Sequence, residues 1–165
     1  MNFDEAFDKL IAHEGGYVND RRDLGGETKF GISKVAYPME DIANLTLERA
    51  KAIYRVDYWG AAGCDGMPDA AKLQLFDMAV NSGVHTAIRT VQRAVGTAPD
   101  GVMGPATLQA VQSMAAARFV ARFNGQRLAF LSDLATWPAF GRGWARRVAD
   151  KIGRASCRER VCNGV

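Results

Sequence analysis

The sequence has little cysteine and no long hydrophobic run. Two of its three cysteines, Cys157 and Cys162, lie in the last fourteen residues, which leaves Cys64 alone in the body of the chain. A single thiol forms neither an internal disulfide nor a metal cluster, and no CxxC motif is present. No apolar stretch approaches the roughly 18 to 20 residues of a membrane-spanning helix, so we expect no stable membrane insertion.

The sequence also lacks a large net charge of either sign. Lys and Arg number 21 against 18 Asp and Glu, but residues 152–165 hold three arginines and one glutamate, so the remaining chain is nearly neutral. A nearly neutral chain does not favour a basic surface that binds the phosphate backbone of a nucleic acid. We therefore expect no nucleic-acid partner. The two histidines, His13 and His85, do not have metal-ligand spacing, and no phosphate loop, dinucleotide fingerprint or serine-hydrolase elbow occurs. We therefore predict no metal and no organic cofactor.

At 165 residues the chain suits one compact domain, or a domain with a small appendage. The N-terminus, MNFDEAFDKL, alternates acids with apolar residues and lacks a signal-peptide pattern, so we expect synthesis in the cytoplasm. Residues 152–165 show no helix stripe, strand alternation or turn pattern and resemble translated sequencing-adapter sequence. We interpret them as a non-native tail that replaces the natural sequence beyond about Lys151.

Hydrophobic periodicity predicts a mostly α protein with one small β excursion. An amphipathic helix is expected at 3–14, a loop or hairpin at 17–32, and a helix from the cap Thr46 to about Tyr58. Residues 69–81 are apolar nearly all round, which is typical of a helix at the centre of a fold.

The C-terminal half predicts further helices. One covers 84–95 and stops at Gly96, and another begins at Pro105, after the turn in TAPDGVMGPATL. A long helical stretch to about Leu134 is expected to break near Gly125. Trp137-Pro138 then predicts a loop, followed by a last short helix.

Glu14 is the most informative position for chemistry. It continues the apolar stripe of the first predicted helix and stands at the negative end of the helix dipole. Partial desolvation and the dipole both disfavour ionisation and raise the pKa of a carboxyl group. A protonated carboxylic acid beside a Gly-rich loop is what general acid catalysis of glycoside cleavage requires. The alternative is a fraying helix end with Glu14 in water.

The following loop supplies possible partners for this acid. Asp20 and Asp23 lie six and nine residues beyond Glu14, and a hairpin can bring either carboxylate across a cleft from it. The Thr28 hydroxyl can position a water molecule, and Asn19 can contact substrate. Each is also an ordinary turn former that bonds its own backbone.

Other candidates are polar or aromatic residues in apolar surroundings. Asp77 and Asn81 are four residues apart on the central helix and either bind substrate or tie this helix to the catalytic loop, because buried polar groups need partners. Tyr17 and Trp59 can stack on sugar faces, although aromatic residues of the core are commoner.

The segment HEGGYVNDRRDLGGETKFGI resembles the signature of glycoside hydrolase family 108, the phage and bacterial N-acetylmuramidases. The EGGY motif stands at 14–17, and the resemblance continues through YRVDYW (54–59) and FDMAVNSG (76–83). The later segment AIRTVQRAVGTAPDGVMGPATLQAV is similar to the peptidoglycan-binding domain that usually follows. We therefore expect a catalytic domain at 1–86 and a peptidoglycan-binding domain at 87–151.

The resemblance implies a lysozyme-like fold and hydrolysis of the β-1,4 bond between N-acetylmuramic acid and N-acetylglucosamine. The essential acid of the family carries over to Glu14. Phage-type lysozymes of the wider superfamily pair their acid with an aspartate nine positions on, which fits Asp23, while their threonine lies one residue beyond Thr28. The second catalytic role stays open between Asp23 and Asp20.

The partner implied is the glycan strand of bacterial peptidoglycan, with a holin or an export system giving access to the wall. We expect a monomer that acts in the periplasm or cell wall, in phage lysis or in bacterial wall remodelling and secretion. Two other functions remain open. One is a lytic transglycosylase, which cuts the same bond but closes a 1,6-anhydro ring, and the other is a non-catalytic wall-binding module.

Overall fold

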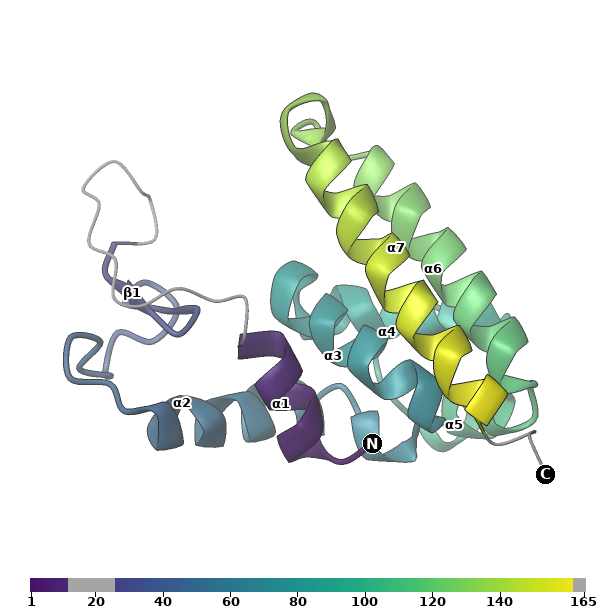
Figure 1. Ribbon diagram of the computed structural model, residues 1–165, viewed down its shortest axis with the longest axis horizontal. Coiled ribbons are helices and arrows are strands. Elements are labelled where there is room, and N and C mark those ends of the chain that lie inside the picture. The colour runs from purple at the N-terminus through teal and green to yellow at the C-terminus, as the bar shows by residue number, and fades with distance from the viewer. Residues whose placement is uncertain (12–25, 162–165) are drawn as a thin grey trace.

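The computed structural model describes the backbone of residues 1–11 and 26–161 and the side chains through residue 152 (Figure 1). The described residues form mainly helices, with one two-stranded antiparallel sheet, which confirms the predicted fold class. The elements in chain order are α1 (Phe3–Ile11), β1 (Thr28–Lys29), β2 (Ile32–Ser33), α2 (Leu47–Ile53), the π-helix η1 (Tyr54–Gly60), the 3₁₀-helix η2 (Cys64–Gly66), α3 (Asp69–Ser82), α4 (Val84–Val95), α5 (Pro105–Gln112), α6 (Ala116–Ser132) and α7 (Trp137–Val161).

Helix α3 is the centre of the core, as its apolar composition predicts. It packs against α1, α4, α6 and α7, and Leu75, Phe76 and Met78 have no exposed surface. The rings of Phe3 and Trp59 meet the Phe76 ring at steep angles, with centroids 5.9 and 5.4 Å away. Such edge-to-face pairs each add about 0.5–1.5 kcal/mol to the effect of burial.

Several helix ends follow the expected capping chemistry. The Thr46 hydroxyl accepts a hydrogen bond from the Arg49 amide at 3.1 Å and starts α2. Gly96 ends α4 with a φ of +84°, and Pro105 occupies the first turn of α5, where its missing N–H costs nothing. The helix predicted to run to about Tyr58 is α2 continued by η1.

The α6–α7 pair corrects three predictions. Helix α6 runs through Gly125 without a break, and the chain interrupts its helices at 113–115 instead. Trp137 and Pro138 begin α7, which is 25 residues long rather than short. Its last part runs through 152–161, where the sequence predicts no regular structure. Packing against α4 and α7 outweighs the cost of about 1 kcal/mol for one glycine in α6.

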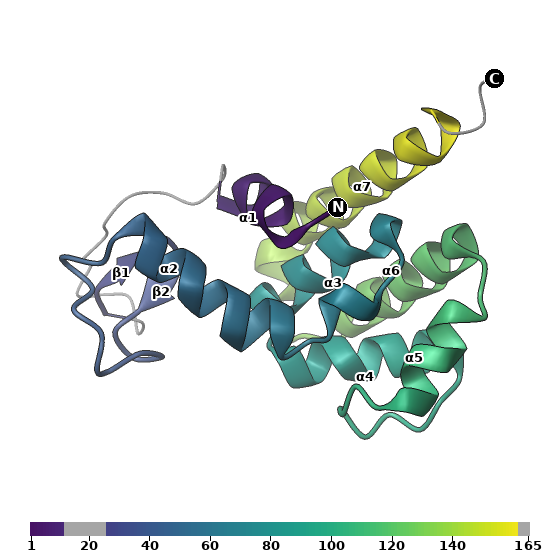
Figure 2. The same cartoon turned by 90° about the horizontal axis from the view of Figure 1, so that it is seen from below.

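The hairpin lies on one side of the molecule and the α3–α7 bundle on the other. Helix α1 lies between α2 and α7 in both views (Figures 1 and 2). Within the part of the chain that the structure describes, no helix combines the length and apolar character needed to cross a bilayer.

Candidate functional site

The β1–β2 hairpin is built on a turn that requires unusual backbone angles. Thr28 pairs with Ser33 and Lys29 with Ile32, which leaves Phe30 and Gly31 as a two-residue turn. Both turn residues have positive φ, +50° and +74°. This combination is typical of a type I′ turn, whose twist matches that of the strands. Phenylalanine rarely adopts such a φ, so surrounding contacts must hold the turn.

Tyr54 supplies one of these contacts. Its ring is 1% exposed, and its hydroxyl donates a hydrogen bond to the Phe30 carbonyl at 3.0 Å. The tip of the hairpin is therefore fastened to the aromatic core. Thr28 lies on the same hairpin, half-buried, and its hydroxyl reaches the Gly26 carbonyl at 3.5 Å. That separation is longer than a normal hydroxyl hydrogen bond.

Five predicted site residues lie outside the described residues: Glu14, Tyr17, Asn19, Asp20 and Asp23. The described chain brackets them closely. Leu10, in the core, is four residues before Glu14, and Gly26 is three residues after Asp23. A chain spans at most about 3.6 Å per residue. The Cα atoms of Leu10 and Glu14 are therefore at most about 14 Å apart, and those of Asp23 and Gly26 at most about 11 Å.

Trp59 belongs to the core rather than to a sugar-binding surface. Its side chain is 2% exposed, and the ring lies edge-on to Phe3 and Phe76. The indole N–H donates to the Asp65 carboxylate at 2.8 Å. A ring covered in this way offers no face to a glycan, so its role is packing.

Asp77 is the best-paired acid of the described chain. It has no exposed surface, and Arg127 donates to Oδ2 at 2.6 Å. Arg147 donates to Oδ1 at 2.9 Å, and the Lys151 ammonium lies 3.6 Å from the same oxygen. A carboxylate without exposed surface cannot contact a glycan directly. The structure therefore gives Asp77 a structural role, with α6 and α7 as the elements that it ties to α3.

This cluster keeps Asp77 ionised. Burial alone raises the pKa of its carboxyl, but the positive charges of Arg127 and Lys151, with the hydrogen bond from Arg147, hold the pKa below its usual value. Arg127, Arg147 and Lys151 therefore all contact the same carboxylate. The Nε and Nη1 atoms of Arg127 are buried and have no hydrogen-bond partner among the described residues.

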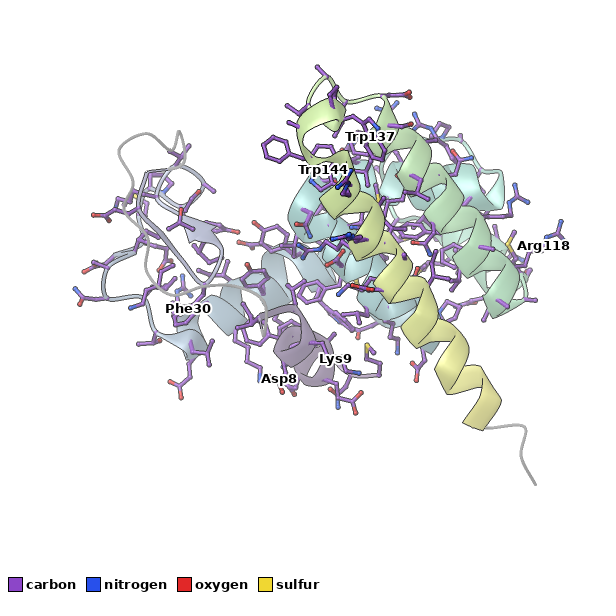
Figure 3. The ribbon with its side chains drawn as sticks, turned by 45° about the horizontal axis from the view of Figure 1, so that its top comes forward. Asp8, Lys9, Phe30, Arg118, Trp137 and Trp144 are labelled. Atoms are coloured by element: carbon purple, nitrogen blue, oxygen red, sulfur yellow. The ribbon has the colours of Figure 1, made fainter. Side chains whose placement is uncertain are left out.

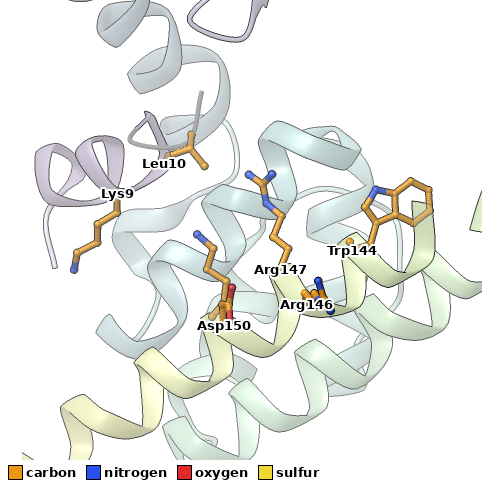
Figure 4. A pocket seen from close by; sticks show the side chains of 8 residues that line it. Lys9, Leu10, Trp144, Arg146, Arg147 and Asp150 are labelled. Atoms are coloured by element: carbon orange, nitrogen blue, oxygen red, sulfur yellow. The ribbon is translucent and has the colours of Figure 1, made fainter. Parts of the chain in front are cut away.

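Two pockets meet beside this cluster. The α1–α7 pocket has a volume of about 350 Å³ and lies between Lys9 and Leu10 of α1 and the face of α7 from Gly143 to Lys151 (Figure 4). The α3–α6–α7 pocket, about 270 Å³, is lined by Arg127 and by the exposed side chain of Asn81, among others. The prediction that Asn81 binds substrate stays a prediction.

Trp144 and Arg147 line both pockets. The Trp144 ring is half-buried and stacks on the exposed Phe140 ring, with the two centroids 5.8 Å apart. The centroid of the Trp137 ring lies 6.2 Å from that of Trp144. Figure 3 shows Trp137 and Trp144 on the first turns of α7, and Phe30 across the molecule in the hairpin. In the described part of the chain, no three His, Cys, Asp or Glu side chains group as metal ligands would.

Comparisons with known proteins show which family the chain belongs to. A family model described as glycosyl hydrolase 108 matches residues 7–83, and one described as a predicted peptidoglycan domain matches residues 86–149. The structure is similar to that of SagA from Brucella abortus, with 36% sequence identity, 94% of each chain covered and a TM-score of 0.85. The chain belongs to the glycosyl hydrolase 108 family. No curated protein matches the sequence significantly.

As a glycosyl hydrolase 108 protein, the chain is a peptidoglycan hydrolase with a mostly α, lysozyme-like fold. Its two matched segments share one core, because α3 of the first segment packs against α4, α6 and α7 of the second. The Asp77 cluster crosses the same boundary. Wall-binding and hydrolase segments are thus joined by apolar and ionic contacts.

The sequence did not predict three residues that hold the hairpin and the Asp77 cluster of this glycosyl hydrolase 108 protein in place. Tyr54 gives no local signal, since its partner Phe30 is 24 residues away. Arg127 and Arg147 lie 50 and 70 residues from Asp77. Only the buried acid on α3 signalled that a cation must come from elsewhere in the chain.

Proposed function

We propose that the protein is an N-acetylmuramidase that hydrolyses the β-1,4 bond between N-acetylmuramic acid and N-acetylglucosamine, with Glu14 as general acid. The observation that carries this proposal is membership of the glycosyl hydrolase 108 family together with an EGGY motif at 14–17. The family is a glycoside hydrolase family, and the motif begins with a carboxylic acid three residues after the amphipathic helix α1 ends at Ile11.

In the proposed reaction, Glu14 gives its proton to the glycosidic oxygen as the bond from C1 to that oxygen breaks. The sugar ring passes through an oxocarbenium-like state, which needs a negative charge nearby. Asp23, or Asp20 in its place, either stabilises this cation or activates water on the opposite face. Water then supplies hydroxide to C1, and its remaining proton restores the acid.

The described residues flank the proposed catalytic segment and hold the hairpin that follows it. Leu10 and Gly26 flank the acidic segment, and the hairpin that follows is fastened by the hydrogen bond from Tyr54 to Phe30. A hairpin held at its tip keeps Thr28 in a fixed place relative to the core. Such fixed placement favours orientation of a substrate or a water molecule.

Hydrolysis of purified peptidoglycan in H₂¹⁸O tests the proposed bond and mechanism together. A muramidase adds one ¹⁸O to a new reducing end on N-acetylmuramic acid, which mass spectrometry of the muropeptides detects. Label on N-acetylglucosamine would overturn the assignment of the bond. Unlabelled 1,6-anhydro products would identify a lytic transglycosylase, and binding to sacculi without any product would identify a non-catalytic module.

The identity of the second carboxylate is tested by Asp23→Asn and Asp20→Asn. We expect Asp23→Asn to lower kcat at least about 100-fold, the usual scale for loss of a catalytic carboxylate. We expect Asp20→Asn to have a much smaller effect, and the reverse order would assign the role to Asp20.

We also propose that the protein acts as a monomer in the periplasm or cell wall, reached through a holin or an export system. The support is the nature of the substrate, since peptidoglycan lies outside the cytoplasmic membrane. Expression in a bacterium with and without a co-expressed holin, followed by measurement of turbidity, separates a lysis role from a secretion role. Lysis without any such partner would contradict the proposed need for one.

A further inference from the structure

The α3–α6–α7 pocket is formed where the two family-matched segments meet. Asn81 and Ser82 line it from the end of α3, in the segment that matches glycosyl hydrolase 108. Its other lining residues come from α6, α7 and the turn between them, in the segment that matches the predicted peptidoglycan domain. Its volume of about 270 Å³ is just below the roughly 300–1,000 Å³ of pockets for drug-sized molecules. The pocket therefore suits one ring-sized group, which would contact both segments at once.

Part of this lining is apolar and aromatic. It consists of Phe130, Leu131, Leu134 and Trp144. The Trp144 side chain is half-buried and is stacked on the ring of Phe140, which lines neither pocket. Stacking holds the indole in place, while the exposed part of its surface lies in the pocket lining. An aromatic surface of this kind is available to a ligand, in contrast to the covered ring of the core.

The rest of the lining is polar. Arg127 and Arg147 each donate to an oxygen of Asp77, at 2.6 and 2.9 Å, so the buried carboxylate fixes both side chains. Asn81 is exposed, and its amide nitrogen donates to the Asp77 backbone carbonyl at 2.6 Å. This bond orients the amide, whose oxygen accepts no hydrogen bond from the described residues. That oxygen can therefore accept a hydrogen bond from a ligand.

This combination of an aromatic ring and an oriented amide indicates a sugar. A pyranose ring has faces made of C–H bonds and a rim of hydroxyl groups, and C–H hydrogens are attracted to the negative face of an aromatic ring. An N-acetyl group adds a methyl group for the apolar lining and an N–H donor for the Asn81 oxygen. The carboxylates of a stem peptide fit less well, because both arginines of the lining are already paired with Asp77.

We propose that the α3–α6–α7 pocket binds one N-acetylated sugar ring of the peptidoglycan glycan, with the ring on Trp144 and the acetamido group at Asn81. The inference goes beyond the proposed function, because it depends neither on Glu14 nor on which bond is cut. It depends on residues of the described pocket and on peptidoglycan as the substrate of the family. A strand bound in this way is held at the junction of the wall-binding and hydrolase segments.

The test measures binding of a tetramer of β-1,4-linked N-acetylglucosamine, which is uncharged and has no stem peptide. Trp144→Leu removes the ring, and its matched control is Trp137→Leu, a half-buried tryptophan of the same helix that lines neither pocket. Asn81→Ala removes the amide, and its control is Gln109→Ala, an exposed amide of α5 outside both pockets. Circular dichroism checks that each variant is folded. Because Asn81 is exposed, Asn81→Ala tests the proposal even if Trp144→Leu does not fold.

In calorimetric titrations we expect Kd for the tetramer to rise about 10-fold in Trp144→Leu and about 3- to 10-fold in Asn81→Ala, with both controls within about 2-fold of wild type. The tetramer should also change the tryptophan emission of wild type and Trp137→Leu but not of Trp144→Leu, because the remaining Trp59 is only 2% exposed. Absence of tetramer binding to wild type, or equal weakening in pocket variants and controls, would overturn the assignment.

Two further measurements separate this proposal from its alternatives. Titration with a free stem peptide tests the other occupant, and binding of that peptide in place of the tetramer, lost in Trp144→Leu, would overturn the sugar assignment. Hydrolysis of purified strands is measured separately. Tetramer binding that depends on Trp144 and Asn81, without hydrolysis of any strand, would leave the pocket assigned and refute the muramidase. Hydrolysis by a protein whose tetramer binding ignores both substitutions would refute the pocket alone.

Discussion

Replacement of Asp77 by asparagine should destabilise the protein far more than loss of any exposed ion pair. The carboxylate is fully buried and is contacted by three cations, one of which, Arg127, is itself only 2% exposed. Arg147 is one-third exposed at its side chain and can turn to water, but Arg127 cannot. Removing one partner of a buried ion pair costs about 3–5 kcal/mol, because the other charge remains uncompensated.

The matched control is Asp69→Asn on the same helix. Asp69 contacts the N-terminal ammonium at 2.6 Å and Lys72 at 2.9 Å, but its side chain is 62% exposed. Exposed pairs contribute at most about 1 kcal/mol, so the control should lose no more than that. Urea unfolding of both variants measures the free energies, and thermal unfolding should show a decrease of roughly 6–20 °C for Asp77→Asn.

The pH dependence of stability tests whether the charge of Asp77 causes this difference. The pKa of the Asp77 carboxyl is lower in the folded protein, so the unfolded chain binds the proton more readily. Its stabilisation is therefore present above the unfolded pKa near 4 and is lost as pH falls through the folded pKa. The gap between wild type and Asp77→Asn should narrow below about pH 4. Adding Arg127→Met to Asp77→Asn should recover part of the loss, and equal losses in Asp77→Asn and Asp69→Asn would refute this reasoning.

Three further predictions concern packing and backbone geometry. Tyr54→Phe should cost about 1 kcal/mol and speed amide exchange in the hairpin, because the Phe30 carbonyl loses its donor; unchanged exchange would contradict this. Trp59→Leu should cost about 2–4 kcal/mol at unchanged KM for peptidoglycan, whereas a raised KM would restore Trp59 as a sugar platform. Gly101→Ala should cost about 1–3 kcal/mol, because φ is +83° and the new Cβ would lie 2.2 Å from a histidine ring nitrogen. Gly104→Ala, with nothing within 4 Å, is its control and should cost less than about 1 kcal/mol in the same unfolding assay.

Local chemistry made much of the fold predictable. Caps and turns depend on residues within a few positions of each other, so the sequence alone locates Thr46, Gly96 and Pro105 correctly. The all-round apolar character of α3 likewise predicts its burial. The wrong predictions, at Gly125 and Pro138, came from residues that break helices only in some contexts. Gly125 is exposed, but its neighbours Phe123 and Asn124 are buried and hold α6 in place. Pro138 is the second residue of α7, where its amide would be unpaired anyway.

The candidate site was predictable only in part. A buried acid on an apolar helix indicates that a cation must meet it, but nothing local selects Arg127 and Arg147 among 21 basic residues. The pocket beside α1 is equally hidden, since Lys9 and Arg146 are 137 positions apart in the sequence. Contacts of this kind depend on how helices pack, which periodicity does not specify.

The most direct test of the account compares wild type with Glu14→Gln on purified peptidoglycan. The amide keeps the size of the side chain but has no proton to give, so release of reducing ends should fall at least about 100-fold. Cosedimentation with sacculi should be unchanged, because the substitution lies outside residues 86–149, which match the predicted peptidoglycan domain. Reducing ends released at the wild-type rate by Glu14→Gln would contradict the central claim that this carboxyl group protonates the glycosidic oxygen.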